Sequence, residues 1–342
     1  MTGRRFPGHR PMTAAPTSPT PLASADSATD PARIIDLQAL GRAADGFARK
    51  AKSANTRRAY TADWDDFGYW CQRFGRVPLP ASPETVALYL ADCSGRLKAS
   101  TLQRRLATIA EAHKTAGLES PTRSPQVRLV WAGIRREKGV AQDHRKPVLT
   151  RHLRAMLAHL PATLVGARDR ALLLLGFAGA MRRSELVGLD VADVAFTDDG
   201  LVAVVRRSKT DQTGVGRKVG IPFGSHPDTC PVRAVQGWLD ATRLDDGPLF
   251  RRVDRHGFVG DARLCDRAVA EVVKRTLLAA GKSARLYAGH SLRAGLITQA
   301  AMNGVSERAI ADQSGHKSLL VLRRYIRDGS LFRENAAAKV GL

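Results

Sequence analysis

Residues 179–186 read GAMRRSEL, and they close the longest apolar run of the 342-residue chain, residues 171–181. That run is too short for a membrane span, which takes about 20 residues, and has the length of a buried helix. Arg182 therefore stands at the mouth of a buried helix, where a guanidinium needs a partner. Glu185, three residues further on, could form an ordinary helix-end ion pair with it. Alone, this segment leaves the role of Arg182 open.

Lys209 lies in a second polar segment, SKT at residues 208–210. The flanking residues, 201–205 and 219–222, are rich in valine and predict two β-strands around a polar, Gly-rich turn. A lysine at the tip of such a hairpin is usually only solvated. The alternative is a mobile cation that reaches a phosphate or gives up a proton. This segment by itself does not decide between the two.

His290 and Arg293 form an H-x-x-R pair directly after Gly289. The apolar side of the following residues predicts a helix that begins here. Residues three apart share one helix face, so the two side chains can converge on one anion near the helix N-terminus. The pattern H-x-x-R is short enough to arise by chance, and its place at a helix start is what makes it informative.

Tyr325 follows His316 by nine residues, in the segment LRRYIR at residues 322–327. Three arginines crowd this tyrosine, which a purely structural tyrosine does not need. A surface tyrosine on a basic helix is the alternative.

The joint order of these motifs carries a resemblance. Along the chain stand Arg182-x-x-Glu185, Lys209, His290-x-x-Arg293, Gly315-His316 and Tyr325. The chain here resembles the tyrosine recombinase (phage integrase) family, with its motifs G-x-x-R-x-S-E-L, S-K-T-x-x-x-G, H-x-L-R and G-H-x-S and a tyrosine nine residues after the last histidine. The resemblance covers about residues 145–330, without a departure at the catalytic positions.

The resemblance implies a covalent mechanism centred on Tyr325. Its phenol would attack a scissile phosphodiester, form a 3′-phosphotyrosyl link and free a 5′-hydroxyl. A phenol has a pKa near 10 and is a weak nucleophile until a base and cations surround it. His290 would help to accept or hold the tyrosyl proton, and Lys209 would protonate the leaving 5′ oxygen.

The resemblance also implies how the charge of the transition state is stabilised. Arg182 and Arg293 would bracket the non-bridging oxygens, and His316 would donate a further hydrogen bond to them. Glu185 would orient Arg182 from behind. These groups would replace the metal ions of other phosphoryl-transfer enzymes, so no metal or other cofactor is expected. Because the bond energy is kept in the phosphotyrosine, re-ligation needs no ATP.

Residues 31–139 predict a bundle of helices. Ser53 can cap a helix with an aromatic stripe, and Ser82 and Ser124, each followed by proline, can begin two others. The helical spacing of the stripe favours a core over a base-stacking platform. The stripe consists of Tyr60, Trp64, Phe67, Trp70 and Phe74. Arginines off the stripes could be solvated or could contact phosphate: Arg57, Arg58, Arg104 and Arg105.

The expected organisation has four parts. Residues 1–30 form a disordered leader, residues 31–139 a helical core-binding (SAM-like) DNA-binding domain, residues 140–149 a linker, and residues 150–342 the catalytic domain, whose first helix Thr150 caps. The fold class is mainly α, with a small antiparallel β-sheet in the catalytic domain. A short helix from Ser330 to Val340 should follow a hinge at residues 327–329 and dock on a neighbouring protomer, as the resemblance suggests, or on its own domain.

Charge points to the partner. The formal net charge is +22, with +9 in residues 31–145 and +12 in residues 146–342. Both predicted domains thus favour a polyanion, double-stranded DNA, and no membrane partner is expected. The resemblance implies a homotetramer on two DNA sites, while accessory DNA-bending proteins stay an open question.

The remaining features concern compartment and alternatives. The cysteines are widely spaced and favour a reduced, cytoplasmic compartment, with the protein on the nucleoid when bound to DNA. A site-specific recombinase or integrase is the first expectation. A type IB topoisomerase and a non-catalytic DNA-binding regulator derived from a recombinase are the alternatives.

Overall fold

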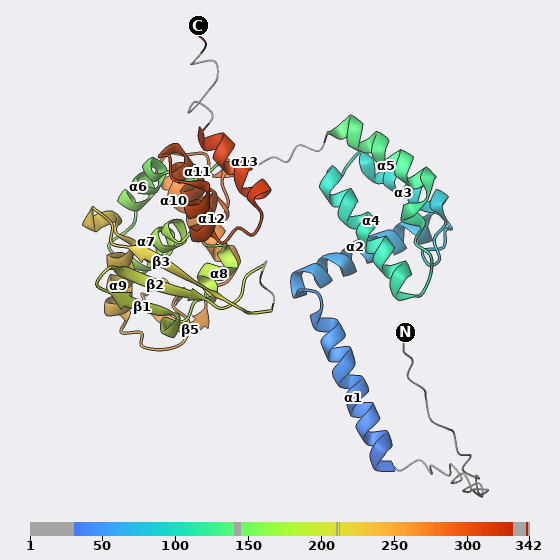
Figure 1. The fold of residues 1–342 in the computed structure, drawn as a ribbon, viewed down its shortest axis with the longest axis horizontal. Helices are drawn as coiled ribbons and strands as arrows, with labels where there is room; N and C mark the ends of the chain where they lie inside the picture. Colours follow the sequence, from blue (N-terminus) through green and yellow to red (C-terminus); the bar gives the residue numbers. More distant parts are fainter. Residues whose placement is uncertain (1–30, 140–144, 210, 212, 331–339, 341–342) are drawn as a thin grey trace, which may run out of the picture. The chain divides into compact units, whose positions relative to one another are not determined.

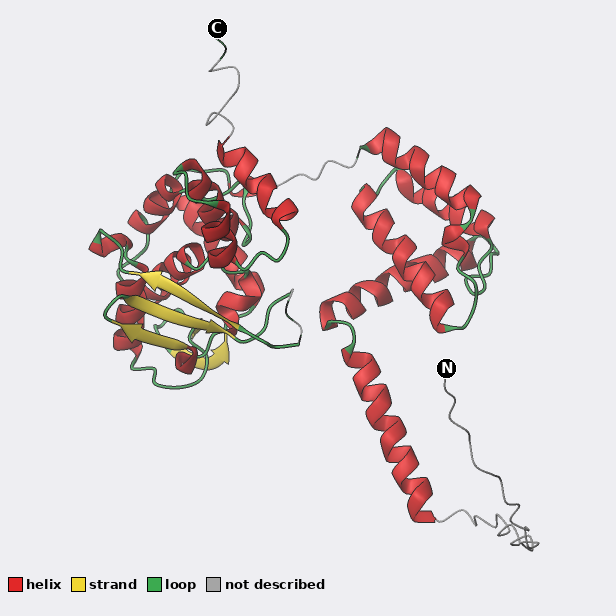
Figure 2. Cartoon of the chain, in the orientation of Figure 1, coloured by secondary structure: helices red, strands yellow, loops and turns green. Residues whose placement is uncertain are grey.

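The computed structural model describes residues 31–139, 145–209, 211, 213–330 and 340. It divides into two compact units, one within residues 1–142 and the other within residues 143–342 (Figure 1). Figure 2 shows that helices dominate both units and that the strands form small sheets, which confirms the predicted fold class. The leader at residues 1–30 and the first half of the expected linker, residues 140–144, lie outside the described residues.

The first unit consists of helices. They are α1 (Pro31–Lys50), α2 (Ala54–Arg73), α3 (Pro83–Ser94), α4 (Ala99–Thr115) and α5 (Pro125–Lys138), with a short 3₁₀ turn, η1 (Pro121–Arg123), before α5. The side chains of Ser53, Ser82 and Ser124 accept a hydrogen bond from the backbone N–H three residues later, as predicted. Each of these caps satisfies a backbone donor that the helix itself leaves unpaired.

The aromatic stripe of α2 contributes to the core of this unit, as its spacing predicted. Phe67 and Trp70 are buried and pack against Tyr89 of α3, with ring centroids 4.9 and 5.4 Å away. Phe74, at the end of the stripe, is half exposed. The middle of the stripe thus joins α2 to α3, whereas Tyr60 and Trp64 are partly exposed and Phe74 reaches solvent.

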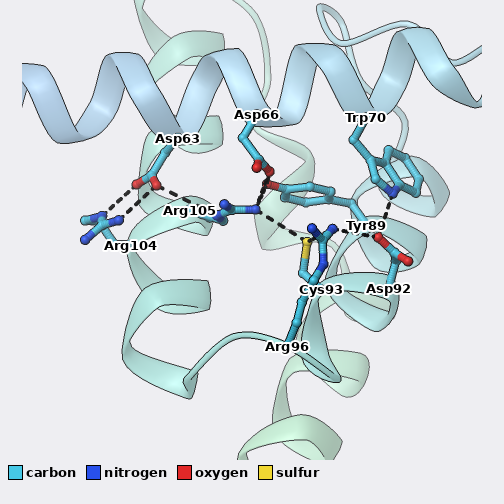
Figure 3. Close-up of polar contacts among 9 residues, drawn as sticks. All are labelled: Asp63, Asp66, Trp70, Tyr89, Asp92, Cys93, Arg96, Arg104 and Arg105. Carbon is cyan, nitrogen blue, oxygen red and sulfur yellow. Dashed lines mark hydrogen bonds and ion pairs between the residues drawn. The ribbon is translucent and has the colours of Figure 1, made fainter.

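A polar network crosses this core (Figure 3). Arg105 of α4 is 9% exposed, and its guanidinium contacts Asp66 and the Tyr89 hydroxyl. Its neighbour Arg104 forms two hydrogen bonds, of 2.7 and 2.9 Å, to the buried Asp63. Arg105 is therefore neither a solvated charge nor available for a phosphate, because it ties α4 to α2 and α3.

The second unit carries the remaining helices around two small sheets. The helices are α6 (Thr150–Ala158), α7 (Leu164–Ala178), α8 (Arg183–Gly188), α9 (Pro231–Thr242), α10 (Asp266–Ala279), α11 (Ser291–Met302), α12 (Glu307–Ser314) and α13 (Leu319–Ser330). Short 3₁₀ turns are η2 (Val191–Asp193), η3 (Pro227–Thr229) and η4 (Ala284–Leu286). Helix α7, the predicted buried helix, lies at the centre of the core, because Leu172, Leu173 and Leu175 are fully buried.

The larger sheet has the order β1 (Val194–Thr197), β2 (Gly200–Val205) and β3 (Arg217–Pro222), all antiparallel. Strands β2 and β3 are the two predicted strands, paired so that Leu201 faces Ile221 and Ala203 faces Val219. Figure 1 shows the hairpin between them extending away from the helices. A second sheet pairs β4 (Arg251–Val253) with β5 (Val259–Arg263).

Two local predictions are wrong. Thr150 is the first residue of α6 and not its cap, because Leu149 holds the cap position with extended backbone angles. Helix α13 runs through Gly329 to Ser330, so residues 327–329 are not a hinge. A single glycine costs a helix only about 1 kcal/mol, and the packing of Leu322 and Ile326 against α11 and α12 outweighs this. Most of the expected tail helix lies outside the described residues.

Among the helices that the structure describes, none is long and apolar enough to cross a lipid bilayer.

Candidate active site

Arg182 and Glu185 meet at the turn between α7 and α8. The Arg182 guanidinium contacts the Glu185 carboxylate, whose other oxygen accepts a hydrogen bond from the Arg182 backbone N–H at 3.0 Å. Glu185 is fully buried, whereas the Arg182 side chain remains 18% exposed. Burial alone would raise the pKa of Glu185, but the hydrogen bonds of Arg182 and the charges of Arg182 and Arg217 lower it. Glu185 therefore stays ionised and fixes the Arg182 guanidinium in a partly exposed position.

Arg217, the first residue of β3, is a member of this site that the sequence did not reveal. Its Nη2 lies 3.4 Å from Glu185, and its Nη1 donates a 3.1 Å hydrogen bond to the Gln313 carbonyl at the end of α12. Burial lowers the pKa of Arg217, although the charge of Glu185 opposes this. Arg217 thus links the sheet to Glu185 on α8 and to the end of α12. A basic residue at the start of a strand gives no signal of this in a sequence.

Arg293 lies on α11 and is 1% exposed. Its Nη1 donates a 2.7 Å hydrogen bond to the carbonyl of Ala180, which the left-handed backbone of Ala180 (φ 46°) turns toward it. Burial, followed by the charge of Arg182, lowers the pKa of Arg293 to about 10. The side chain therefore remains charged at neutral pH. A buried charge without a carboxylate directly on it is suited to an anion that arrives from outside.

His316 sits above Arg293, just after the end of α12. Gly315 adopts a left-handed conformation (φ 64°) that ends the helix, and a side chain there would collide with Arg217. The His316 ring nitrogens lie 3.3 and 3.4 Å from Arg293 Nη2. Burial, followed by the charges of Arg293 and Arg182, lowers the pKa of His316 to about 4. The ring is therefore neutral at physiological pH.

Tyr325 of α13 completes the cluster. Its hydroxyl lies 2.8 Å from Nε2 of His290, the residue that precedes α11. The Tyr325 ring also lies 6.3 Å, centre to centre, from the ring of His316. Tyr325 is partly buried and His290 is exposed, so the phenol oxygen and its hydrogen-bond partner lie at the surface of the unit. A phenol and an imidazole are thus in direct contact.

Lys209 is the predicted site residue that the structure does not bring into the cluster. It is exposed at the tip of the β2–β3 hairpin, where the backbones of Ser208 and Asp211 close a tight turn. Within the described part of the chain, Lys209 has no hydrogen bond or ion pair to the other site residues. Asp211 steadies the turn by accepting hydrogen bonds from the backbone N–H groups of Gly216 and Val215, which lower its pKa.

The structure therefore gathers six of the seven predicted site residues and leaves Lys209 at the exposed tip of the β2–β3 hairpin. The gathered residues are Arg182, Glu185, His290, Arg293, His316 and Tyr325. They come from four separate segments of the chain, and all except Glu185 can donate a hydrogen bond or carry a proton to an anion. A partly buried phenol in contact with an imidazole, in a cluster with two guanidiniums, is suited to nucleophilic attack on a phosphodiester.

Comparison with known proteins identifies the family. The profile described as "Phage integrase family" matches residues 148–330. The "Integrase/recombinase xerD homolog" of Selenomonas ruminantium is 41% identical over 310 residues, covering 89% of this chain and 91% of that protein. The "Recombinase cre" of Escherichia phage P1 is 26% identical over 301 residues, covering 82% and 86%.

Solved structures show the same fold at lower identity. The Tn1549 transposon integrase in complex with transposon right end DNA has a TM-score of 0.59 at 16% identity, covering 86% of this chain and 98% of that one. The lambda integrase dimer bound to a COC′ core site has a TM-score of 0.57 at 18% identity, covering 84% and 94%. By its family match and its relatives, the chain belongs to the phage integrase family and is a tyrosine recombinase.

Proposed function

We propose that this recombinase cuts and rejoins specific sites in double-stranded DNA through a 3′-phosphotyrosyl intermediate on Tyr325, without a metal ion or ATP. The observation that carries the proposal is the 2.8 Å contact between the Tyr325 hydroxyl and His290 Nε2, in a cluster that includes the guanidiniums of Arg182 and Arg293. An acceptor at this distance can take the phenol proton as the oxygen attacks phosphorus.

The surrounding residues have two kinds of role: some bind the phosphate, and others hold these residues in position. Arg293 and Arg182 hold the two non-bridging oxygens, whose negative charge grows in the transition state. His316 adds a hydrogen bond to the same phosphate. Glu185 and Arg217 touch neither phosphate nor nucleophile, and they hold the first arginine and the α12 turn in place. These are roles that preorganised protein charges can fill.

Lys209 acts from the hairpin. Its exposed position in the free protein leaves it able to move, and closure of the hairpin on bound DNA would bring its ammonium to the leaving 5′ oxygen. A lysine suits this task because it is a compact donor on a flexible stem. The Asp211 turn keeps the lysine at the tip of the hairpin while the arm moves.

DNA as the partner is supported by charge. The formal net charge of +22 suits a protein that neutralises many phosphates. Solved relatives of the same fold are described on DNA, including a lambda integrase tetramer bound to a Holliday junction. We extend this to the present chain as a homotetramer that holds two DNA sites.

One experiment tests the reaction. A binding site is first selected from a pool of random duplexes, and a nick is then placed beside the scissile phosphate so that the cleaved strand diffuses away. An active enzyme accumulates a covalent protein–DNA adduct on this substrate, in EDTA as well as in magnesium. No adduct would favour the non-catalytic regulator, and a requirement for magnesium would contradict the mechanism.

A second assay separates the recombinase from a topoisomerase. Two duplexes of different length, each with the selected site, should exchange strands to give products of two new lengths. Relaxation of supercoiled DNA without strand exchange would favour the type IB topoisomerase.

A further inference from the structure

Ser314, the last residue of α12, is fully buried directly beneath His316. Its Oγ lies 2.6 Å from the carbonyl oxygen of Ile310 and 2.6 Å from Nδ1 of His316. The left-handed Gly315 between the two residues folds the imidazole back over the hydroxyl. No role for Ser314 follows from the motifs of the sequence or from the reaction described above.

Counting protons decides the direction of these hydrogen bonds. A hydroxyl has one proton, and a carbonyl oxygen can only accept. Two oxygens 2.6 Å apart need a proton between them, so the Ser314 hydroxyl donates to Ile310. Its contact with His316 can then be a hydrogen bond only if the imidazole donates from Nδ1.

The contact with Arg293 is compatible with this assignment. Arg293 Nη2 lies 3.3 Å from Nδ1 and 3.4 Å from Nε2, and a guanidinium can only donate. With the ring proton on Nδ1, Nε2 is the atom that accepts from Arg293. With the proton on Nε2, Nδ1 would face a hydroxyl with no proton left to give, so the contact with Ser314 decides between the two tautomers.

We propose that Ser314 is a positioning residue that fixes the tautomer of His316, accepting from Nδ1–H and leaving Nε2 to hold Arg293 until DNA arrives. His316 thus orders Arg293 in the free protein. When a phosphate takes over the N–H groups of Arg293, Nε2 is released. The hydrogen bond from His316 to the phosphate, which rests on the proposed function, then forms once Nε2 takes up a proton from water, which the negative charge of the phosphate favours.

Nuclear magnetic resonance of the histidine ring reads the tautomer directly. In the full chain with labelled histidine, the ¹⁵N shifts and the ¹³Cδ2 shift of His316, assigned by loss of its signals in His316→Gln, should show Nδ1–H in the free protein. Ser314→Ala, and the better space-filling Ser314→Cys, should shift the ring toward Nε2–H, which histidine favours in water. Ser306→Ala is the matched control, because it removes the serine cap at the other end of α12.

The proposal would be overturned if His316 of the unmodified protein carried its proton on Nε2. It would also be overturned if the Ser314 variants kept the proton on Nδ1. A change of the His316 tautomer in Ser306→Ala would overturn it as well, since that outcome would make helix stability the cause.

The effect of Ser314 on the reaction is measured with the nicked substrate. Ser314→Ala and Ser314→Cys should form adduct about tenfold more slowly at saturating DNA, with DNA affinity within about twofold of the unmodified protein. Ser306→Ala should keep the unmodified rate. Equal rates in all variants would refute the positioning role while the proposed function stood. No adduct from the unmodified protein would refute the proposed function, while the tautomer would still test Ser314.

Discussion

At the scale of single residues, the charged side chains of the site differ in how they are buried and paired. Glu185 is buried and paired twice, whereas Arg293 is buried against backbone and an imidazole. Glu185 thus holds Arg182 and Arg217 in place by charge, whereas backbone and imidazole contacts hold Arg293. In the proposed mechanism both Arg182 and Arg293 contact the phosphate.

The neutral state of His316 makes a prediction about acid stability. Its pKa is about 4 in the folded protein, below the usual 6.5. As the pH falls from 6.5 toward 4, the unfolded chain binds a proton that the folded chain does not, so the free energy of unfolding falls. His316→Gln cannot titrate and should lose less stability over this range, measured by urea unfolding at pH 7 and pH 4.5.

The control for this prediction is His159→Gln, at the exposed end of α6. It should lose as much stability as the unmodified protein between the two pH values. An equal loss in His316→Gln would show that His316 does not carry the effect.

The role of Lys209 can be tested by changing the leaving group. Lys209→Ala should reduce cleavage of a normal substrate by about 100-fold or more, because the departing 5′ oxygen then lacks a proton donor. A substrate with sulfur at the bridging 5′ position should restore most of the rate, since a thiolate leaves without a proton. Lys218→Ala, on β3, serves as the control. A defect that sulfur does not rescue would contradict a general-acid role.

At the scale of elements, sequence patterns predicted the helices whose ends carry a chemical signal. Serine caps at Ser53, Ser82 and Ser124 predicted three starts, because each hydroxyl replaces a missing backbone bond. The start of α6 carries no such signal, because Leu149 holds the cap position and its side chain makes no capping hydrogen bond, so Thr150 is the first helical residue. Helix α13 continued through Gly329 because tertiary packing overrides a local preference.

In the candidate site, too, sequence motifs predicted some residues, and others became visible only in the folded structure. Motif order predicted the residues that meet around Tyr325. Arg217 and Ser314 were missed, because their roles depend on which side chains the fold places beside them. Arg105 could not be assigned from the sequence, since burial of a charge becomes visible only once α2, α3 and α4 are packed together.

The Arg105 network predicts where the first unit is most vulnerable. Arg105→Ala leaves Asp66 and Tyr89 without their shared partner and should lower the free energy of unfolding of this unit by about 3 kcal/mol. Trp238→Phe removes the tryptophan of the second unit, so the remaining fluorescence reports unfolding of the first unit. Urea unfolding in that background makes the measurement.

Arg96→Ala is the matched control. This arginine lies just after α3, is exposed, and pairs with Asp92 four residues earlier in the chain. It should cost less than about 1 kcal/mol. Similar costs for the two variants would mean that the buried network does not stabilise the unit.

At the scale of the whole molecule, the proposed homotetramer would need a docking surface on the second unit. An apolar cavity of about 490 Å³ lies between α6, α7, α11, α12 and the end of β3. It is lined by leucine, phenylalanine and isoleucine side chains, among them Leu153, Phe177 and Ile310. The sequence after Ser330 offers Leu331, Phe332, Ala336 and Val340 as apolar contacts. We expect the tail of a neighbouring protomer to fill this cavity.

Deletion of residues 331–342 should then leave binding to one site within about twofold but abolish the two-site complex in a gel-shift assay. Val305→Glu, at the exposed rim of the cavity, should reproduce the loss, because a carboxylate there opposes an apolar tail. Leu278→Glu, exposed on α10 away from the cavity, should assemble normally. Normal recombination by the truncated chain would show that the tail is dispensable.

The most direct test of the account is the identity of the residue bonded to DNA. Digestion of the trapped adduct with nuclease and protease, followed by mass spectrometry, should place a nucleotide phosphate on Tyr325. Tyr325→Phe should bind the site with unchanged affinity and give no adduct, whereas Tyr287→Phe, at a buried tyrosine of the same unit, should still give it. Adduct formation by Tyr325→Phe, or a nucleotide found on any other residue, would contradict the account.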